Sequence, residues 1–150
     1  MQKPLYILAL LALNFSSCGV GQSKPARQVA DSVTRIEMNL SAFGVESDDF
    51  PSIEVYIDFV SGLSKCTKSY YNPAFKPSSY TLSVEDMRKI SLLFNNFDLR
   101  KFKAEYTDSR TDQPTSTTII YVGERKFVIK DYGLVGQYPL QELYKIVYKL

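Results

Sequence analysis

The sequence contains no histidine and no tryptophan among its 150 residues. Without histidine, the chain cannot form the Ser-His-Asp or Cys-His arrangements of nucleophilic enzymes, nor a metal centre built on imidazole ligands. It also lacks a marked excess of either charge, because 18 lysine and arginine residues face 16 aspartate and glutamate residues, for a net charge of +2. So weak a positive field argues against a protein that binds nucleic acid.

Long hydrophobic runs are lacking as well, and the apolar segment near the N-terminus is short. Residues Leu5–Leu13 follow Lys3 and precede the small residues of Ser16–Cys18. A transmembrane helix needs about 20 apolar residues. A charged start, roughly ten apolar residues and a small-residue end are instead typical of a secretory signal peptide. We therefore predict a signal peptide over residues 1–17.

The end of that segment, Ser16-Ser17-Cys18, resembles the lipobox of bacterial lipoproteins, in which small residues precede a cysteine. The resemblance implies that the signal peptide is cut before Cys18 and that the nucleophilic thiolate of this cysteine accepts the lipid. Two or three acyl chains would anchor the protein stably to a bilayer, since each buried methylene contributes about 0.8 kcal/mol. Glycine, proline and polar residues then predict a flexible tether over residues 18–32. The alternative is an ordinary signal peptide beside an uninvolved cysteine.

The residues after Cys18 imply a location, by resemblance to the sorting of bacterial lipoproteins. Gly19 stands where an aspartate would imply retention in the inner membrane. No acidic cluster follows that would imply export to the cell surface. We therefore expect a lipid-anchored protein of the bacterial cell envelope, on the periplasmic face of the outer membrane.

Alternating apolar and polar residues predict strands in the rest of the chain, which we assign to one domain over residues 33–150. A first strand is predicted over residues 33–40. Two further strands, over residues 53–60 and 63–71, are joined by Ser61-Gly62 as a two-residue hairpin turn.

The register of this hairpin sets Asp58 opposite Lys65, where the two charges would attract each other. It also sets Cys66 opposite Ile57, on the apolar face, which predicts a buried and inert thiol. If Cys18 is lipidated, Cys66 has no partner for an intramolecular disulfide. A free thiol that pairs with another chain is therefore the alternative.

Apolar residues at three- and four-residue spacing predict two helices. Ser83 begins the first, because a serine followed by acidic residues forms a capping box, and the pattern ends near Asn95. Pro139 begins the second, because the missing amide of proline costs nothing in a first turn. The side chains expected to face the core are Val84, Met87, Ile90, Phe94 and Phe97 in the first helix, and Leu140, Leu143, Tyr144, Val147 and Leu150 in the second.

Strands over residues 117–122 and 125–130 form a second predicted hairpin around Gly123-Glu124, a pair that suits a type II′ turn. A short further strand is predicted at residues 80–82. Hairpin-linked strands with two helices predict an α+β fold, in which an antiparallel sheet of about five to six strands carries both helices on one face.

A hairpin, a helix and a charged loop flanked by phenylalanine follow one another along the chain. The motifs Thr111–Thr115 and Lys130–Gly133 come next, before a closing helix rich in leucine. In this order and in these motifs, residues 34–150 resemble a family of uncharacterised bacterial lipoproteins, common in the Bacteroidetes and defined only as a domain of unknown function. The resemblance implies no activity, because the family has none assigned.

Tyrosine is abundant, with eleven residues gathered near the predicted strands. Tyr56 and Tyr121 point away from the apolar faces of their strands. Tyrosine supplies a large amphipathic contact area at low entropic cost, so an outer sheet face that carries it would suit a partner such as another envelope protein. The alternative is that tyrosine simply favours half-buried strands.

The polar loop of residues 105–115 is a second candidate, for a small molecule, a glycan or a metal. Its carboxylates Glu105, Asp108 and Asp112, together with Asp131, could gather oxygen ligands for Ca²⁺, but their spacing lacks the pattern of a calcium-binding loop. Asp112 alternatively orders a turn before proline. The candidate binding residues of this loop and the following strand are Tyr106, Asp108, Asp112 and Tyr132.

We therefore expect a lipid-anchored, non-catalytic binding or accessory module with no cofactor, which contacts a membrane through its anchor and binds no nucleic acid. One alternative is a protein that binds a small ligand, a glycan or a metal. The other is a hydrolase without histidine, although no Ser-x-x-Lys motif lies at the head of a helix.

Overall fold

The structure is a computed structural model that describes residues 32–95 and 97–150. The strands are β1 (Arg35–Ser41), β2 (Ser52–Asp58), β3 (Leu63–Ser69), β4 (Ser78–Tyr80), β5 (Glu105–Thr107), β6 (Thr115–Val122) and β7 (Arg125–Tyr132). The helices are α1 (Val84–Asn95), the 3-10 helix η1 (Leu99–Lys101) and α2 (Leu140–Tyr148). The predicted signal peptide and Cys18 lie outside the described residues. Within the described part of the chain, no helix is long and apolar enough to cross a membrane.

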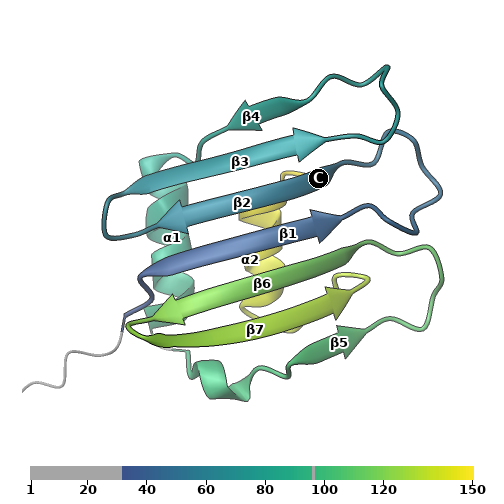
Figure 1. The fold of residues 1–150 in the computed structure, drawn as a ribbon. Coiled ribbons are helices and arrows are strands. Elements are labelled where there is room, and N and C mark those ends of the chain that lie inside the picture. Colours follow the sequence, from purple (N-terminus) through teal and green to yellow (C-terminus); the bar gives the residue numbers. More distant parts are fainter. Residues whose placement is uncertain (1–31, 96) are drawn as a thin grey trace, which may run out of the picture.

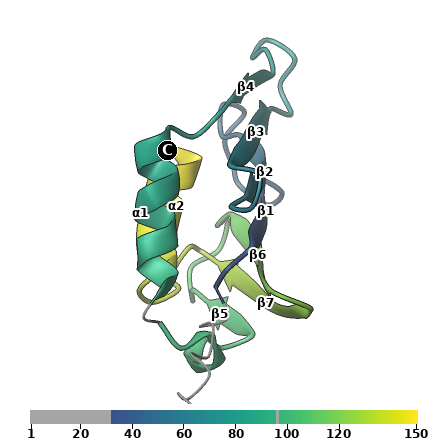
Figure 2. The ribbon, with the colours of Figure 1, turned by 90° about the vertical axis from the view of Figure 1, so that its left-hand side faces the viewer.

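The strands form one sheet of seven, in the order β4-β3-β2-β1-β6-β7-β5 (Figure 1). Neighbouring strands pair antiparallel, except β5 and β7, which pair parallel. Both long helices lie against the same face of this sheet (Figure 2). The predicted α+β fold with a mostly antiparallel sheet and two helices is therefore confirmed, whereas the count of about five to six strands is too low.

Apolar residues at alternate positions of the strands build the core between sheet and helices. On β1, Ile36, Met38 and Leu40 are buried, as the alternation predicts. Ile120 and Ile129, from the second hairpin, lie on the same inner face. The opposite face of the sheet, which we call the outer face, carries no helix among the described residues.

The two shortest strands depart from the sequence prediction. β5 lies in the predicted polar loop, where Ala104 O accepts a 2.9 Å hydrogen bond from Lys130 N. Three residues are too few for a recognisable alternation, so only pairing with β7 defines this strand. The strand predicted at residues 80–82 instead ends at Tyr80, and Leu82 N donates to Ser64 Oγ at 2.9 Å.

The first hairpin pairs in a different register from the predicted one. Tyr56, not Asp58, faces Lys65, and Cys66 faces Val55 rather than Ile57. The shift is of two residues, and side chains alternate with a period of two, so every residue keeps its predicted face. Cys66 is therefore buried, as predicted, with no exposed surface.

The turn of this hairpin explains the shifted register. It covers four residues, Phe59–Gly62, instead of the two that were predicted. The Asp58 carboxylate, predicted to attract Lys65, accepts hydrogen bonds from Val60 N at 2.8 Å and Ser61 N at 3.2 Å. These bonds stabilise the longer turn.

The helix ends also differ from the predicted apolar faces. Val84 and Leu150 are 88% and 63% exposed, although both were expected to face the core. Tyr148 was not expected to face the core but is completely buried. Val84 is the first residue of α1. At the other end, Lys149 takes a left-handed conformation with φ of 50°, which ends α2 and turns Leu150 away.

The serine half of the predicted capping box of α1 is confirmed, because Ser83 Oγ accepts a 3.0 Å hydrogen bond from Asp86 N. We expect Ser83→Ala to lower the free energy of unfolding by about 1 kcal/mol, the usual cost of a lost cap. Urea titration followed by circular dichroism would measure this loss. The exposed Ser109→Ala serves as the control, and equal effects of the two substitutions would contradict the capping role.

Candidate functional site

The outer face of the sheet is the larger of the two regions that the sequence singled out. Tyr56, between the buried Val55 and Ile57 of β2, lies on this face and is 40% exposed. Tyr121 of β6 lies on it as well, because its neighbours Ile120 and Val122 are buried on the inner side. Between them runs β1, whose Glu37 pairs with Tyr56.

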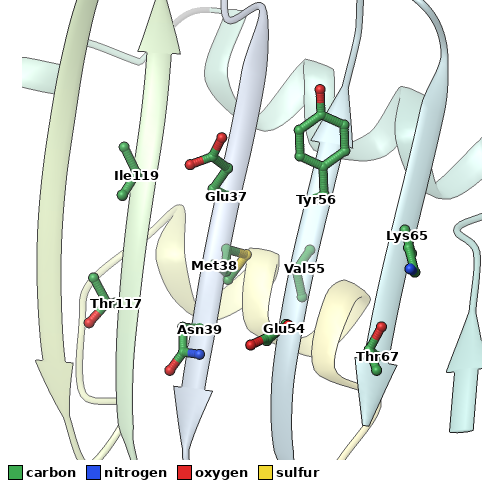
Figure 3. A pocket seen from close by; sticks show the side chains of 10 residues that line it. All are labelled: Glu37, Met38, Asn39, Glu54, Val55, Tyr56, Lys65, Thr67, Thr117 and Ile119. Carbon is green, nitrogen blue, oxygen red and sulfur yellow. The ribbon is translucent and has the colours of Figure 1, made fainter.

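A shallow hollow of about 380 Å³ lies in the middle of this face (Figure 3). It spans four adjacent strands, β6, β1, β2 and β3, so its floor is backbone held by the sheet. We call it the first hollow, and its lining residues are Glu37, Met38, Asn39, Glu54, Val55, Tyr56, Lys65, Thr67, Thr117 and Ile119. Two carboxylates, one ammonium group and one tyrosine ring thus surround a rigid surface.

Tyr121 does not line the first hollow but belongs to a cluster beside it. The guanidinium carbon of Arg35 lies 3.9 Å from the centroid of the Tyr121 ring. The Tyr121 hydroxyl donates a 2.9 Å hydrogen bond to Glu37 Oε2, and Arg35 Nε lies 3.1 Å from Glu37 Oε1. The cluster therefore fixes the position of Glu37, the carboxylate that it shares with the first hollow.

The sequence alone did not identify Glu37, Glu54 and Lys65 as parts of this site. Each lies at an outward position of its strand, which the alternation does predict. The strand order that brings these three strands together is a property of the fold. Only the register of β2 with β3 then sets Lys65 beside Tyr56.

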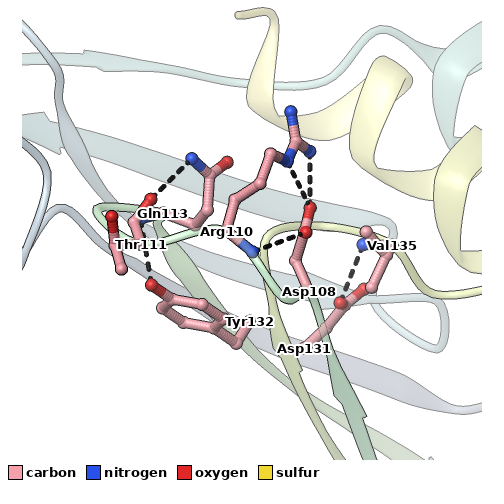
Figure 4. Close-up of polar contacts among 7 residues, drawn as sticks. All are labelled: Asp108, Arg110, Thr111, Gln113, Asp131, Tyr132 and Val135. Atoms are coloured by element: carbon pink, nitrogen blue, oxygen red, sulfur yellow. Dashed lines mark hydrogen bonds and ion pairs between the residues drawn. The ribbon is translucent and has the colours of Figure 1, made fainter.

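The second candidate region, the loop of residues 105–115, is held together by its own side chains (Figure 4). Arg110 Nε donates to Asp108 Oδ2 at 2.9 Å, and Arg110 N donates to Asp108 Oδ1 at 3.0 Å. The hydrogen bonds and positive charge of Arg110 lower the pKa of the Asp108 carboxyl to about 2. Asp108 is thus an ionised partner of Arg110.

The remaining three candidate residues of this region also have structural roles. The Tyr106 hydroxyl accepts from Lys103 N at 3.2 Å, and its ring packs against the core. The Tyr132 hydroxyl accepts from Gln113 N at 3.3 Å. Asp112 has a φ of 58°, a left-handed conformation that aspartate tolerates in turns. The two tyrosine hydroxyls and the turn at Asp112 therefore order this segment of the chain.

Asp131, considered for Ca²⁺ from the sequence, is a completely buried carboxylate. It accepts hydrogen bonds from Val135 N at 2.9 Å, from Gly136 N at 2.8 Å and from the Tyr144 hydroxyl at 3.0 Å. A Cβ at position 136 would lie 2.5 Å from Asp131 Oδ2, so the close approach requires glycine. Among the described residues, no group of three or more metal-binding side chains gathers here or elsewhere.

Cys66 offers no reactive thiolate. Burial is the main cause that raises the pKa of its thiol above the usual range, so the sulfur is protonated at neutral pH. The buried position beside β4 agrees with the predicted inert thiol and leaves no surface for a disulfide with another chain.

One comparison with known proteins gives a match. The model of a domain of unknown function, DUF6438, matches residues 47–150, which include every element from β2 to α2. No curated protein and no solved structure matches the chain. The predicted resemblance to a domain of unknown function is thus confirmed, whereas bacterial origin and lipid attachment stay predictions.

Proposed function

This chain belongs to the DUF6438 family of domains of unknown function, and we propose that it is a non-catalytic binding module whose partner contacts the outer face of the sheet. A lipid on Cys18 would hold the module at a membrane of the bacterial envelope, on the periplasmic face of the outer membrane. The partner would be another envelope protein.

One observation carries this proposal: within the described residues the helices cover one face of the seven-stranded sheet, and the other face is hollowed around an exposed tyrosine. The side chains of the first hollow project from paired strands, so little conformational freedom is lost when a partner binds. Tyrosine in such a place can supply much of the binding energy of an interface.

Three of the carboxylates considered as sites are held by hydrogen bonds or ion pairs, which supports a role in binding rather than in catalysis. Asp108 is bound by Arg110, and Asp131 is bound by two backbone amides and a tyrosine. Glu37 is held by Tyr121 and Arg35. The chain contains no histidine that could act as a general base beside them.

The test is capture of the partner by cross-linking in the native cell, followed by purification of the full chain. We expect Tyr56→Ala to weaken the captured complex at least tenfold, because truncating a central interface residue costs about 2 kcal/mol and each 1.4 kcal/mol is a factor of ten. The melting temperature should change little, since Tyr56 contributes no buried core surface.

Leu92→Ala is the matched control for this experiment. Leu92 is 52% exposed on α1, on the opposite side of the sheet from the first hollow. Capture that falls equally in both variants, or in neither, would contradict a binding role for the outer face.

A further inference from the structure

A second hollow, of about 420 Å³, lies at one end of the same outer face. It opens between the loop that joins β1 to β2 and the loop that joins β3 to β4. These loops lie at the opposite end of the sheet from the start of β1 (Figure 1). No residue that lines it also lines the first hollow, so it is a separate site.

Aromatic rings from both loops surround the second hollow. Phe43, from the first loop, and Tyr71, from the second, are 93% and 94% exposed. Rings left in water in this way contribute almost nothing to the core, and loops that carry them are common places for binding. Tyr70, which also lines the second hollow, is half-buried and packs beside Phe75, with ring centroids 5.5 Å apart.

Serine hydroxyls form the side of the second hollow that adjoins the sheet. Ser41, Ser52 and Ser69 end β1, begin β2 and end β3, and all three line it. Ser52 Oγ accepts from Ala42 N at 3.2 Å, and Ser41 Oγ accepts from Phe43 N at 3.2 Å. The hydroxyls thus hold the loop that carries the Phe43 ring.

The charge of the second hollow limits what it can bind. Among its lining residues, only Asp48 carries a charge at neutral pH, and neither lysine nor arginine is present. A phosphate or carboxylate ligand would meet no cation there. A ligand with apolar faces and many hydroxyl groups would match both the rings and the serines.

We propose that the second hollow binds a neutral carbohydrate. An apolar C–H face of a sugar ring would stack on Phe43 and Tyr71, and its hydroxyls would hydrogen-bond the serines and the Asp48 carboxylate. The volume suits a small ligand, and the mixture of aromatic rings with a few polar groups is typical of such sites. This proposal is independent of the proposed partner at the first hollow.

Isothermal titration of the purified full chain tests the proposal, in a detergent whose headgroup is not a sugar. The probes are cellohexaose, chitohexaose and maltohexaose, with tetramethylammonium chloride as a cationic competitor for the aromatic rings. We expect at least one oligosaccharide to bind at millimolar concentration. The double variant Phe43→Ala/Tyr71→Ala should weaken that binding at least about tenfold, as expected for anchoring aromatic residues, at an unchanged melting temperature.

Val60→Ala is the control that should bind as the natural chain does, because Val60 is 80% exposed in a turn at the other end of the strands. Three results would overturn the proposal. They are the failure of all three sugars to bind, tighter binding of tetramethylammonium than of any sugar, and sugar binding that Tyr56→Ala abolishes while the double variant retains it. The last result would assign the sugar to the first hollow.

Discussion

Replacing Asp131 by alanine is expected to lower the free energy of unfolding by about 3 to 5 kcal/mol, because each buried donor left without an acceptor costs about 1–3 kcal/mol. The substitution removes the acceptor of Val135 N, of Gly136 N and of the Tyr144 hydroxyl. These donors belong to the segment between β7 and α2 and to α2 itself. The loss would therefore weaken the attachment of α2 to the sheet, although its buried apolar side chains remain in the core.

Urea denaturation followed by circular dichroism would measure this effect. Asp131→Asn keeps one acceptor oxygen but turns an N–H group toward the donors, so a smaller loss of about 1–3 kcal/mol is expected. Glu124→Ala, in the exposed turn between β6 and β7, is the control and should stay within about 0.5 kcal/mol. A loss below about 1 kcal/mol for Asp131→Ala would show that the buried carboxylate does not hold this segment.

Replacing Cys18 by alanine is expected to move the protein from the membrane fraction to the soluble fraction. The proposed lipid would be absent, and with it the transfer of acyl chains that contributes about 0.8 kcal/mol per buried methylene. Cell fractionation with immunoblotting of the tagged full chain measures the distribution. Incorporation of radiolabelled palmitate measures the lipid directly.

The second cysteine of the chain provides the matched control. Cys66→Ala removes a buried thiol from the core and should leave both palmitate incorporation and membrane association unchanged. Palmitate lost from Cys66→Ala but retained by Cys18→Ala would contradict the proposed anchor. Membrane association that survives Cys18→Ala without labelling would indicate that another segment binds the membrane.

Alternation and helical spacing predicted the fold class well because each is a local property. The buried Ile36, Met38 and Leu40 of β1 follow from period two, and the start of α1 follows from the Ser83 cap. Predictions failed where only a few residues determine the local structure. The four-residue turn after Asp58 shifted the first hairpin, and three-residue β5 has too short a pattern to detect.

For the candidate sites too, the direction of a side chain could be predicted from the sequence, whereas its neighbours could not. Tyr56 and Tyr121 were correctly placed outward on their strands, since burial of their neighbours decides that direction. Their surroundings could not be predicted, because Glu37 meets Tyr121 only through the pairing of β1 with β6, which are separated in the chain by most of the domain. Phe43 and Tyr71 line one hollow for the same reason, since they come from two different loops.

By itself, the sequence determined the class of fold, the inward and outward sides of the long strands, and the absence of histidine chemistry. These depend on composition and on contacts between residues close in the chain. Tertiary structure alone decided the strand order, the position of the two hollows and the hydrogen-bond partners of the carboxylates. Asp131 shows why: its charge suggested a metal ligand, but the chain folds back so that two backbone amides and the hydroxyl of Tyr144 occupy its oxygens instead.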